Sequence, residues 1–249
     1  MSIFWALLRR ELSAFFFSLT GYVIIAAVTL VIGSSFVMLI RNLGTDPVSM
    51  PVTELFFNSM MYWLIVILMT PVVTMRLFAL EKASGTFETL MTTQVSDLQV
   101  VAAKFLAALI FYLVAWLPTL ACLMIVQRFT NQPKLDPGMV SGLYLGIFLS
   151  GCLFLSLGCL ASSLTRSQMV AAVVSLAVGV LLFILGYMAQ ALPDAGQSPA
   201  DPLFYFNLFK QMEDFTRGVV DTQVVISYLS ATLFFLFLTL RVVESRRWK

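Results

Sequence analysis

The sequence contains few of the residues from which catalytic and metal sites are built. It has no histidine and only three cysteines, at positions 122, 152 and 159. Without histidine no Ser–His or Cys–His nucleophile pair can form, and most metal sites lose a preferred ligand. The Gly-x-x-x-x-Gly-Lys loop that holds ATP phosphates is also missing. We therefore expect no catalytic residue, metal or cofactor in this chain, and any energy that it uses must come from another chain.

The composition excludes a soluble protein. Of 249 residues, 60% are hydrophobic and only 11% are charged, and the mean hydropathy is +0.94. A soluble domain carries about 25% charged residues to cover its surface. Low charge also excludes a disordered chain, whose hydrophobicity is low and whose net charge is high. The sequence therefore predicts an integral membrane protein.

The charged residues divide the chain into six uncharged stretches that are long enough to cross a bilayer, which takes about 20 apolar residues. We expect an all-α, polytopic membrane protein with six transmembrane helices forming one transmembrane domain over residues 1–249, with five or seven spans as alternatives. Only Arg166 separates the fourth stretch from the fifth, which predicts a tight turn there. The stretches are Phe17–Ile40, Leu55–Met75, Phe105–Gln127, Pro137–Thr165, Ser167–Pro193 and Thr222–Leu240.

Basic residues indicate the orientation. With six spans, ten Lys and Arg residues fall on the side of the two termini and five on the other side. By the positive-inside rule both termini should be cytoplasmic, in a bacterial inner membrane. Residues 1–16 place Phe4, Leu8, Leu12 and Phe15 on one helical face, which predicts an amphipathic helix in the cytoplasmic interface. No ionisable residue lies inside a predicted span, which argues against a proton-coupled carrier or a voltage sensor.

Small residues recur every fourth position in two spans. This spacing lets helix backbones approach closely, within one subunit or between two, although Gly and Ala are also simply common in membrane helices. The candidates for such a packing or dimer seam are Gly142, Gly146 and Ser150 in one span and Ala171, Ser175 and Gly179 in the next.

The segment Arg76–Lys104 is predicted to form a structured cytoplasmic elbow. Ser84-Gly85 should break the helix that continues from the second span through Lys82. A short helix fits Thr86 to Met91, and Ser96 to Gln99 forms a capping-box pattern. Phe87, Leu90 and Met91 would be exposed together unless they contact a partner, which favours a docking surface over a solvated loop.

Residues 81–90, EKASGTFETL, followed by Ser96-Asp97 and Lys104, resemble the E-K-x-x-G-T-x-E-x-L … S … K signature of ABC-2 type permeases. In that family the signature forms a coupling helix on a separate ATPase subunit, which binds ATP and Mg. The resemblance also implies that the permease pairs with a second copy or a homologous permease. Phe215–Asp221 and Arg246-Arg247 are similar to the gliding-motility (GldF-like) branch. The ATPase contact implied for this chain consists of Glu81, Gly85, Thr86, Phe87, Glu88, Leu90 and Met91.

The polar segment 193–221 lies on the opposite side of the membrane. Leu208, Met212, Phe215 and Val219 fall on one apolar helical face, and Gly218 is a suitable helix end. The family resemblance suggests a re-entrant pair of short helices that closes a pathway, whereas an interfacial helix joining spans five and six is the alternative. The candidate gate residues are Phe204, Phe206, Phe209, Phe215 and Gly218.

The leading hypothesis is the membrane subunit of an ATP-driven ABC-2 exporter or mechanically coupled complex, with cytoplasmic ABC ATPases as partners. The alternative is a non-transporting scaffold that transmits force to extracytoplasmic or accessory membrane subunits. An ion-coupled carrier is disfavoured by the uncharged spans. We expect no nucleic-acid partner, and the substrate is not indicated by any residue.

Overall fold

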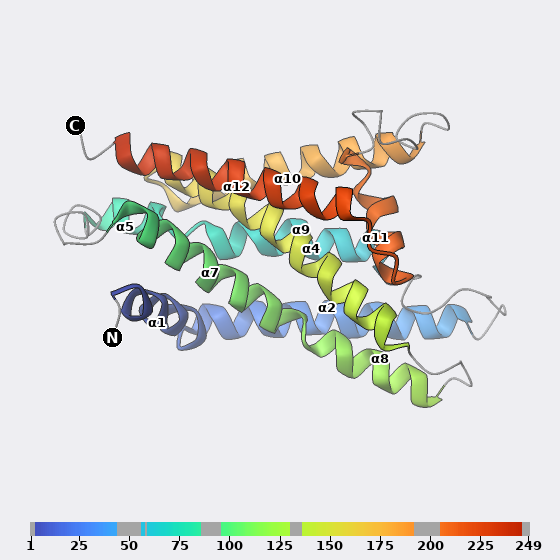
Figure 1. The fold of residues 1–249 in the computed structure, drawn as a ribbon. Coiled ribbons are helices and arrows are strands. Elements are labelled where there is room, and N and C mark those ends of the chain that lie inside the picture. Colours follow the sequence, from blue (N-terminus) through green and yellow to red (C-terminus); the bar gives the residue numbers. More distant parts are fainter. Residues whose placement is uncertain are drawn as a thin grey trace.

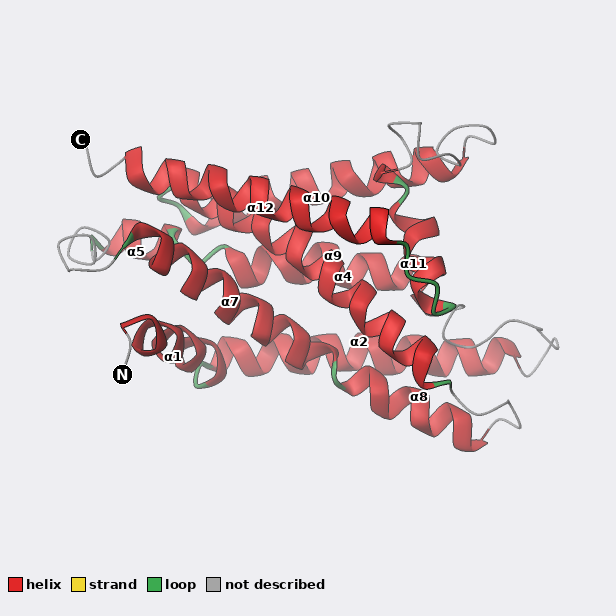
Figure 2. Cartoon of the chain, in the orientation of Figure 1, coloured by secondary structure: helices red, strands yellow, loops and turns green. Residues whose placement is uncertain are grey.

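The structure is a computed structural model that describes residues 3–43, 56–57, 59–85, 96–129, 136–191 and 205–245. Within these ranges every regular element is a helix, as Figure 2 shows, so the all-α prediction is confirmed. The helices are α1 Ile3–Phe16, α2 Leu19–Leu43, α4 Met60–Thr74, α5 Ala79–Ser84, α7 Asp97–Trp116, α8 Pro118–Phe129, α9 Pro137–Leu164, α10 Gln168–Ala191, α11 Leu208–Thr216 and α12 Thr222–Ser245.

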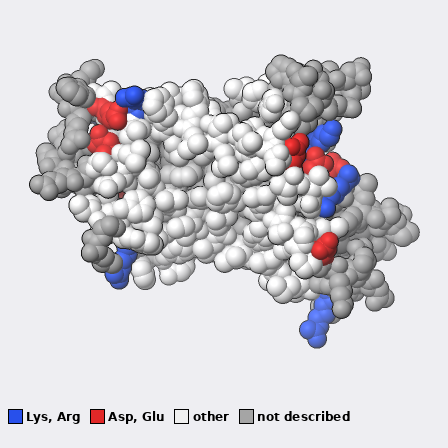
Figure 3. Space-filling model, viewed as in Figure 1, with Lys and Arg blue, Asp and Glu red and all other residues white. Residues whose placement is uncertain are grey.

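Six helical stretches are long and apolar enough to cross a membrane, as predicted. They run up and down between two ends of the molecule (Figure 1). The helix α1, the C-terminal end of α12 and α5 lie at one end, called here the α5 end, and α11 lies across the other, the α11 end. Charged side chains gather at these two ends, and the visible middle of the surface is uncharged (Figure 3). This distribution matches a slab of hydrocarbon across the middle of the bundle.

Local sequence signals account for several helix ends. Ser96 accepts a hydrogen bond from the backbone N–H of Gln99, and the Gln99 side chain bonds back, so the predicted capping box is present at the start of α7. The tight turn around Arg166 is also confirmed, because α9 ends at Leu164 and α10 begins at Gln168. Pro118 lies at the junction between α7 and α8, where the chain axis bends (Figure 1).

Three helices form the centre of the bundle. Within the apolar windows of the spans that contain α4, α7 and α9, 67%, 67% and 78% of residues are buried, against 17%, 22% and 22% for α2, α10 and α12. The centre is strongly aromatic, since Tyr62, Trp63 and Trp116 are almost fully buried, with the Tyr62 ring 5.1 Å from that of Trp63 and 5.2 Å from that of Trp116. The Tyr62 hydroxyl is 2.9 Å from the Ser150 hydroxyl on α9 and forms a hydrogen bond with it.

Two glycines of α9 allow the central helices to pack closely, and the sequence reasoning missed both. A Cβ on Gly151 would lie 2.5 Å from the Tyr112 ring of α7, and one on Gly158 would lie 2.2 Å from the Thr74 hydroxyl of α4. These positions are seven residues apart and therefore two helical turns apart on one face of α9. The sequence carries this signal as Gly-x6-Gly, which the four-residue spacing of small residues does not include.

The sequence predicted that the second span continues as one helix through Lys82, but the structure interrupts it. The helix α4 ends at Thr74, residues 75–78 form turns, and α5 begins at Ala79. The hydroxyl of Ser162 on α9 accepts hydrogen bonds from the backbone N–H groups of Phe78 and Ala79, at 3.1 Å each. The same hydroxyl lies 3.3 Å from the Met75 carbonyl, to which it donates. A side chain from a distant helix thus satisfies the backbone groups that the interruption frees.

Candidate functional site

The short helix α5 leads into the segment that the sequence identified as a coupling elbow. It ends at Gly85, which has a φ of +73°, and among the described residues no neighbouring atom lies within 4 Å of a Cβ added there. The left-handed conformation ends the helix as predicted, a role that suits glycine. The remaining predicted contact residues, Thr86 to Met91, lie outside the described residues.

The fold holds α5 from the side of α9. Besides the two backbone bonds to Ser162, the Lys82 ammonium donates a hydrogen bond to the Ser163 carbonyl oxygen. The residues of α5 therefore contact the C-terminal end of α9 through both main chain and side chain. A displacement of α5 has to move α9 or break these bonds.

Four charged side chains hold α5 from the other side. Lys104 of α7 lies with its Nζ 3.1 Å from Oε1 of Glu11 on α1 and 2.9 Å from Oε1 of Glu81 on α5. Arg10 Nη2 lies 2.7 Å from the same Glu11 oxygen and 3.0 Å from the same Glu81 oxygen. We call Arg10, Glu11, Glu81 and Lys104 the ionic joint, because it links three helices that are distant in the sequence.

The ionic joint combines buried and exposed charges. Lys104 is only 2% exposed, and the Glu11 and Glu81 side chains are 12% and 18% exposed, whereas Arg10 is half exposed. Burial opposes the charge of Arg10, but hydrogen bonds and the charges of Glu11 and Glu81 outweigh it and raise the pKa of Arg10 above its usual value. The joint is neutral overall, with two bases and two acids.

The sequence reasoning identified Glu81 as a contact residue but missed the joint as a unit. It placed Lys104 outside the spans, yet α7 begins at Asp97 and Lys104 lies inside the candidate span Asp97–Ile125. The helices extend beyond the uncharged stretches that the sequence defined, so charged residues such as Glu81, Asp97 and Lys104 lie in the end parts of the candidate spans. One signal was available, since Glu11 follows Leu8 by three residues and precedes Phe15 by four, which puts a carboxylate on the apolar face of α1.

That apolar face of α1 contacts protein. Leu8 is buried against Ala103 and Ala107 of α7, and Phe15 stacks on Phe111 with ring centroids 5.0 Å apart. Figure 1 shows α1 almost end-on beside the long helices that run across the picture, so it lies across the bundle axis as an interfacial helix would.

The small-residue triplets both lie in seams within the chain. A Cβ on Gly142 would lie 2.5 Å from the Phe215 carbonyl oxygen, and one on Gly146 would lie 2.9 Å from the Met212 sulfur, so these two face α11. Ser150 bonds to Tyr62. The second triplet, Ala171, Ser175 and Gly179, is buried, and Gly179 faces Phe154 of α9 and Ile67 of α4.

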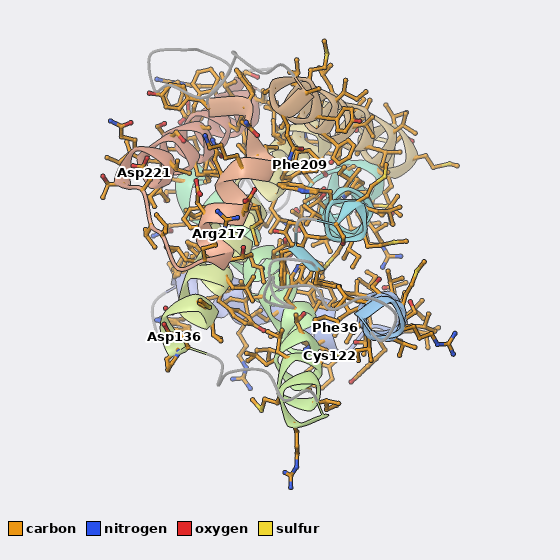
Figure 4. All side chains as sticks on the ribbon, turned by 90° about the vertical axis from the view of Figure 1, so that its right-hand side faces the viewer. Phe36, Cys122, Asp136, Phe209, Arg217 and Asp221 are labelled. Carbon is orange, nitrogen blue, oxygen red and sulfur yellow. The ribbon has the colours of Figure 1, made fainter. Side chains whose placement is uncertain are left out.

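At the α11 end, one short helix covers the bundle. Phe209 lies inward, with its ring 5.2 Å from Trp63 and 5.3 Å from Phe183, and Phe215 is buried, whereas Phe206 is exposed. Phe204 lies outside the described residues. Figure 4 looks onto this end and labels Phe209, Arg217 and Asp221 on and after α11.

The predicted apolar face of this segment is shorter than expected. Leu208, Met212 and Phe215 are buried, but Val219 is 57% exposed. The helix ends first, because Gly218 adopts a φ of +80°, its N–H bonds to the Phe215 carbonyl, and the Val219 N–H bonds to the Asp214 carbonyl. These two bonds form a Schellman ending, which takes Val219 off the helical face.

The six apolar helices with charged ends define a multi-pass membrane protein. Residues 45–243 match the family model described as "ABC-2 family transporter protein". This match covers more than half of the chain, so the chain belongs to the ABC-2 family of transporter membrane proteins. No curated protein matches the chain. The matched residues include Glu81 and Lys104 but begin after Arg10 and Glu11, so α1 contributes half of the ionic joint from outside the matched region.

Proposed function

We propose that this chain is the permease subunit of an ATP-driven ABC-2 exporter, and that separate ABC ATPase subunits, which bind ATP and Mg, drive it through the elbow 76–104. The family membership supports the class of protein. The observation that carries the coupling is the ionic joint with the Ser162 bonds, which attach α5 to α1, α7 and α9 at the base of the elbow.

The hydrogen bonds and ion pairs of α5 suggest how a displacement caused by the ATPase is transmitted through the bundle. A partner that displaces residues 86–91 pulls on α5 through Gly85. The joint transmits that displacement to α7 and α1, and Ser162 and Ser163 transmit it to α9. Because α7 and α9 form the central packing with α4, the three central helices move together rather than one by one.

The charge distribution supports an orientation with the α5 end in the cytoplasm of a bacterial cell and the α11 end outside. A second permease copy, or a homologous permease, would complete the transporter, and the largely unburied helices α2, α10 and α12 offer it apolar surface. The short helix α11 is the proposed outer closure and a contact for accessory extracytoplasmic subunits. Membership of the GldF-like branch stays a prediction from Phe215–Asp221.

The test is reconstitution of the chain with the ABC ATPase that co-purifies with it. The double variant Gly85→Pro/Glu88→Arg should lose ATPase assembly, since proline cannot adopt a positive φ and the new charge opposes docking. Gly33→Ala is the control and should assemble normally, because a Cβ added there meets no atom of another described element within 4 Å. Retained assembly by the double variant, or ATP hydrolysis by the chain alone, would overturn the proposal.

The same preparation separates export from force transmission. An exporter accumulates substrate in sealed vesicles in an ATP-dependent way. The alternative, a non-transporting scaffold, would hydrolyse ATP at a rate that depends on an extracytoplasmic partner bound to the polar side of α11, with no accumulation of substrate.

A further inference from the structure

A cavity of about 500 Å³ lies at the α5 end, between the turn that joins α1 to α2 and the segment that joins α4 to α5. It shares only Glu81 with the proposed ATPase contact, because most of its walls come from α1, α2 and the end of α4. Most of the surface that lines it is apolar. The apolar wall residues include Phe15, Val23, Ile24, Val72, Leu77 and Leu80.

The charges that line the cavity do not balance. Three bases, Arg10, Arg76 and Lys104, face it with two acids, Glu11 and Glu81, so the lining carries a net charge of +1 (3 − 2). The two acids are already engaged by Arg10 and Lys104 in the ionic joint. The surplus positive charge therefore belongs to Arg76.

Arg76 is half-buried, and its only hydrogen bond within the described ranges is to a neutral group. Its Nη1 donates to the Thr20 hydroxyl at 2.7 Å, and no carboxylate pairs with it in the part of the chain that the structure describes. A guanidinium has five N–H donors, so most of its capacity remains for another acceptor. A charge in this setting favours an anion that accepts two hydrogen bonds, as a phosphate does.

The cavity is open to the side of the bundle where lipid would lie. Val23, Val72 and Leu80 line it and are also exposed on the outer surface. A ligand that fills it must combine an anionic head with an apolar body, because a small soluble anion would leave the apolar walls unoccupied.

We propose that this cavity binds a phospholipid of net negative charge from the leaflet at the α5 end, with its phosphate on Arg76 and one acyl chain along the apolar wall. Lipid binding at this site does not require the ATPase, so the test of this proposal and the test of the proposed function can fail independently. Its occupant bridges α1, α2 and α4, next to the ionic joint.

The test uses the full-length chain in nanodiscs of phosphatidylcholine that contain a trace of phosphatidylglycerol with a photoreactive acyl chain. After illumination, mass spectrometry should find labelling concentrated in residues 19–24 and 72–80, and unlabelled phosphatidylglycerol should compete much better than phosphatidylcholine. Arg76→Gln should lower this labelling about tenfold, the value of one charge-assisted hydrogen bond. Arg9→Gln, an exposed arginine of α1 outside the cavity lining, is the matched control and should leave it unchanged.

Two further variants keep the test decisive if Arg76→Gln does not fold. Arg76→Lys preserves the charge and should retain most of the labelling, and Val72→Trp fills the cavity without touching a charge and should abolish it. Labelling spread evenly over α10 and α12, equal competition by phosphatidylcholine, or labelling that survives Val72→Trp would each overturn the proposal. Displacement by millimolar inorganic phosphate would show a site for a soluble anion and would also overturn it.

Discussion

Replacement of Lys104 by methionine tests the ionic joint most directly. Methionine has a similar length and no charge, so the change removes two ion pairs with little change in packing volume. At separations of 3.1 and 2.9 Å and an effective dielectric constant of about 20, each pair is worth about 5 kcal/mol of Coulomb energy before desolvation. Much of this offsets the cost of burying the lysine itself.

The cost of the substitution comes mainly from the acids left behind. Glu11 and Glu81 have side chains that are only 12% and 18% exposed, and their Oε1 atoms converge on one ammonium. Breaking a buried pair by removing one partner costs about 3–5 kcal/mol. Arg10 still contacts both carboxylates, so we expect the lower end, about 3 kcal/mol, which corresponds to a fall in Tm of roughly 6–12 °C for a domain of this size.

Intrinsic tryptophan fluorescence during thermal unfolding in mild detergent measures this change, because Trp63 and Trp116 are almost completely buried. Lys104→Met/Glu81→Gln should recover at least half of the loss, since one uncompensated carboxylate disappears. Arg9→Met, at an exposed site on the same helix as Arg10, should lie within about 0.5 kcal/mol of wild type. A Lys104→Met protein as stable as Arg9→Met, or a double variant less stable than the single one, would refute the reasoning.

Three further predictions concern the contacts of α9 and α5. Gly158→Ala should destabilise the chain by about 1–3 kcal/mol in the same unfolding assay, because its Cβ would lie 2.2 Å from the Thr74 hydroxyl. Gly33→Ala should be neutral, and equal effects of the two variants would contradict the packing argument. Ser162→Ala should lower the free energy of unfolding by about 1–3 kcal/mol and speed hydrogen exchange at the Phe78 and Ala79 amides. The control Ser163→Ala keeps the backbone carbonyl that Lys82 contacts and should leave both amides protected. Gly85→Ala should weaken ATPase assembly, because alanine in the left-handed conformation adds about 1–2 kcal/mol of backbone strain, and Gly85→Asn should weaken it less. An alanine variant that assembles like wild type would show that the φ of +73° is not needed.

Features that depend on a few neighbouring residues were predictable from the sequence. The capping box at Ser96, the turn at Arg166 and the helix ends at Gly85 and Gly218 each follow from chemistry within about four positions. The six spans are equally readable, because hydrocarbon thickness fixes the length of an uncharged stretch.

Features that depend on partners far along the chain were not predictable. The break between α4 and α5 is stabilised by Ser162, 84 residues after Phe78, and the joint pairs Glu11 with Lys104 across 93 residues. No residue near Phe78 or Glu11 in the sequence indicates which distant residue will contact it. The candidate site was therefore found as a segment, while the contacts that hold it required the folded chain.

The hydrogen bonds between α4 and α9 also constrain the order of events during synthesis. Tyr62 and the Phe78 backbone emerge from the ribosome well before Ser150 and Ser162, which complete their hydrogen bonds. A polar group without a partner in hydrocarbon costs several kcal/mol. We therefore expect the second span to stay in the insertion machinery or beside water until the fourth span has been made, so that the centre assembles late. Chains truncated before residue 137 should then be substrates for membrane quality control.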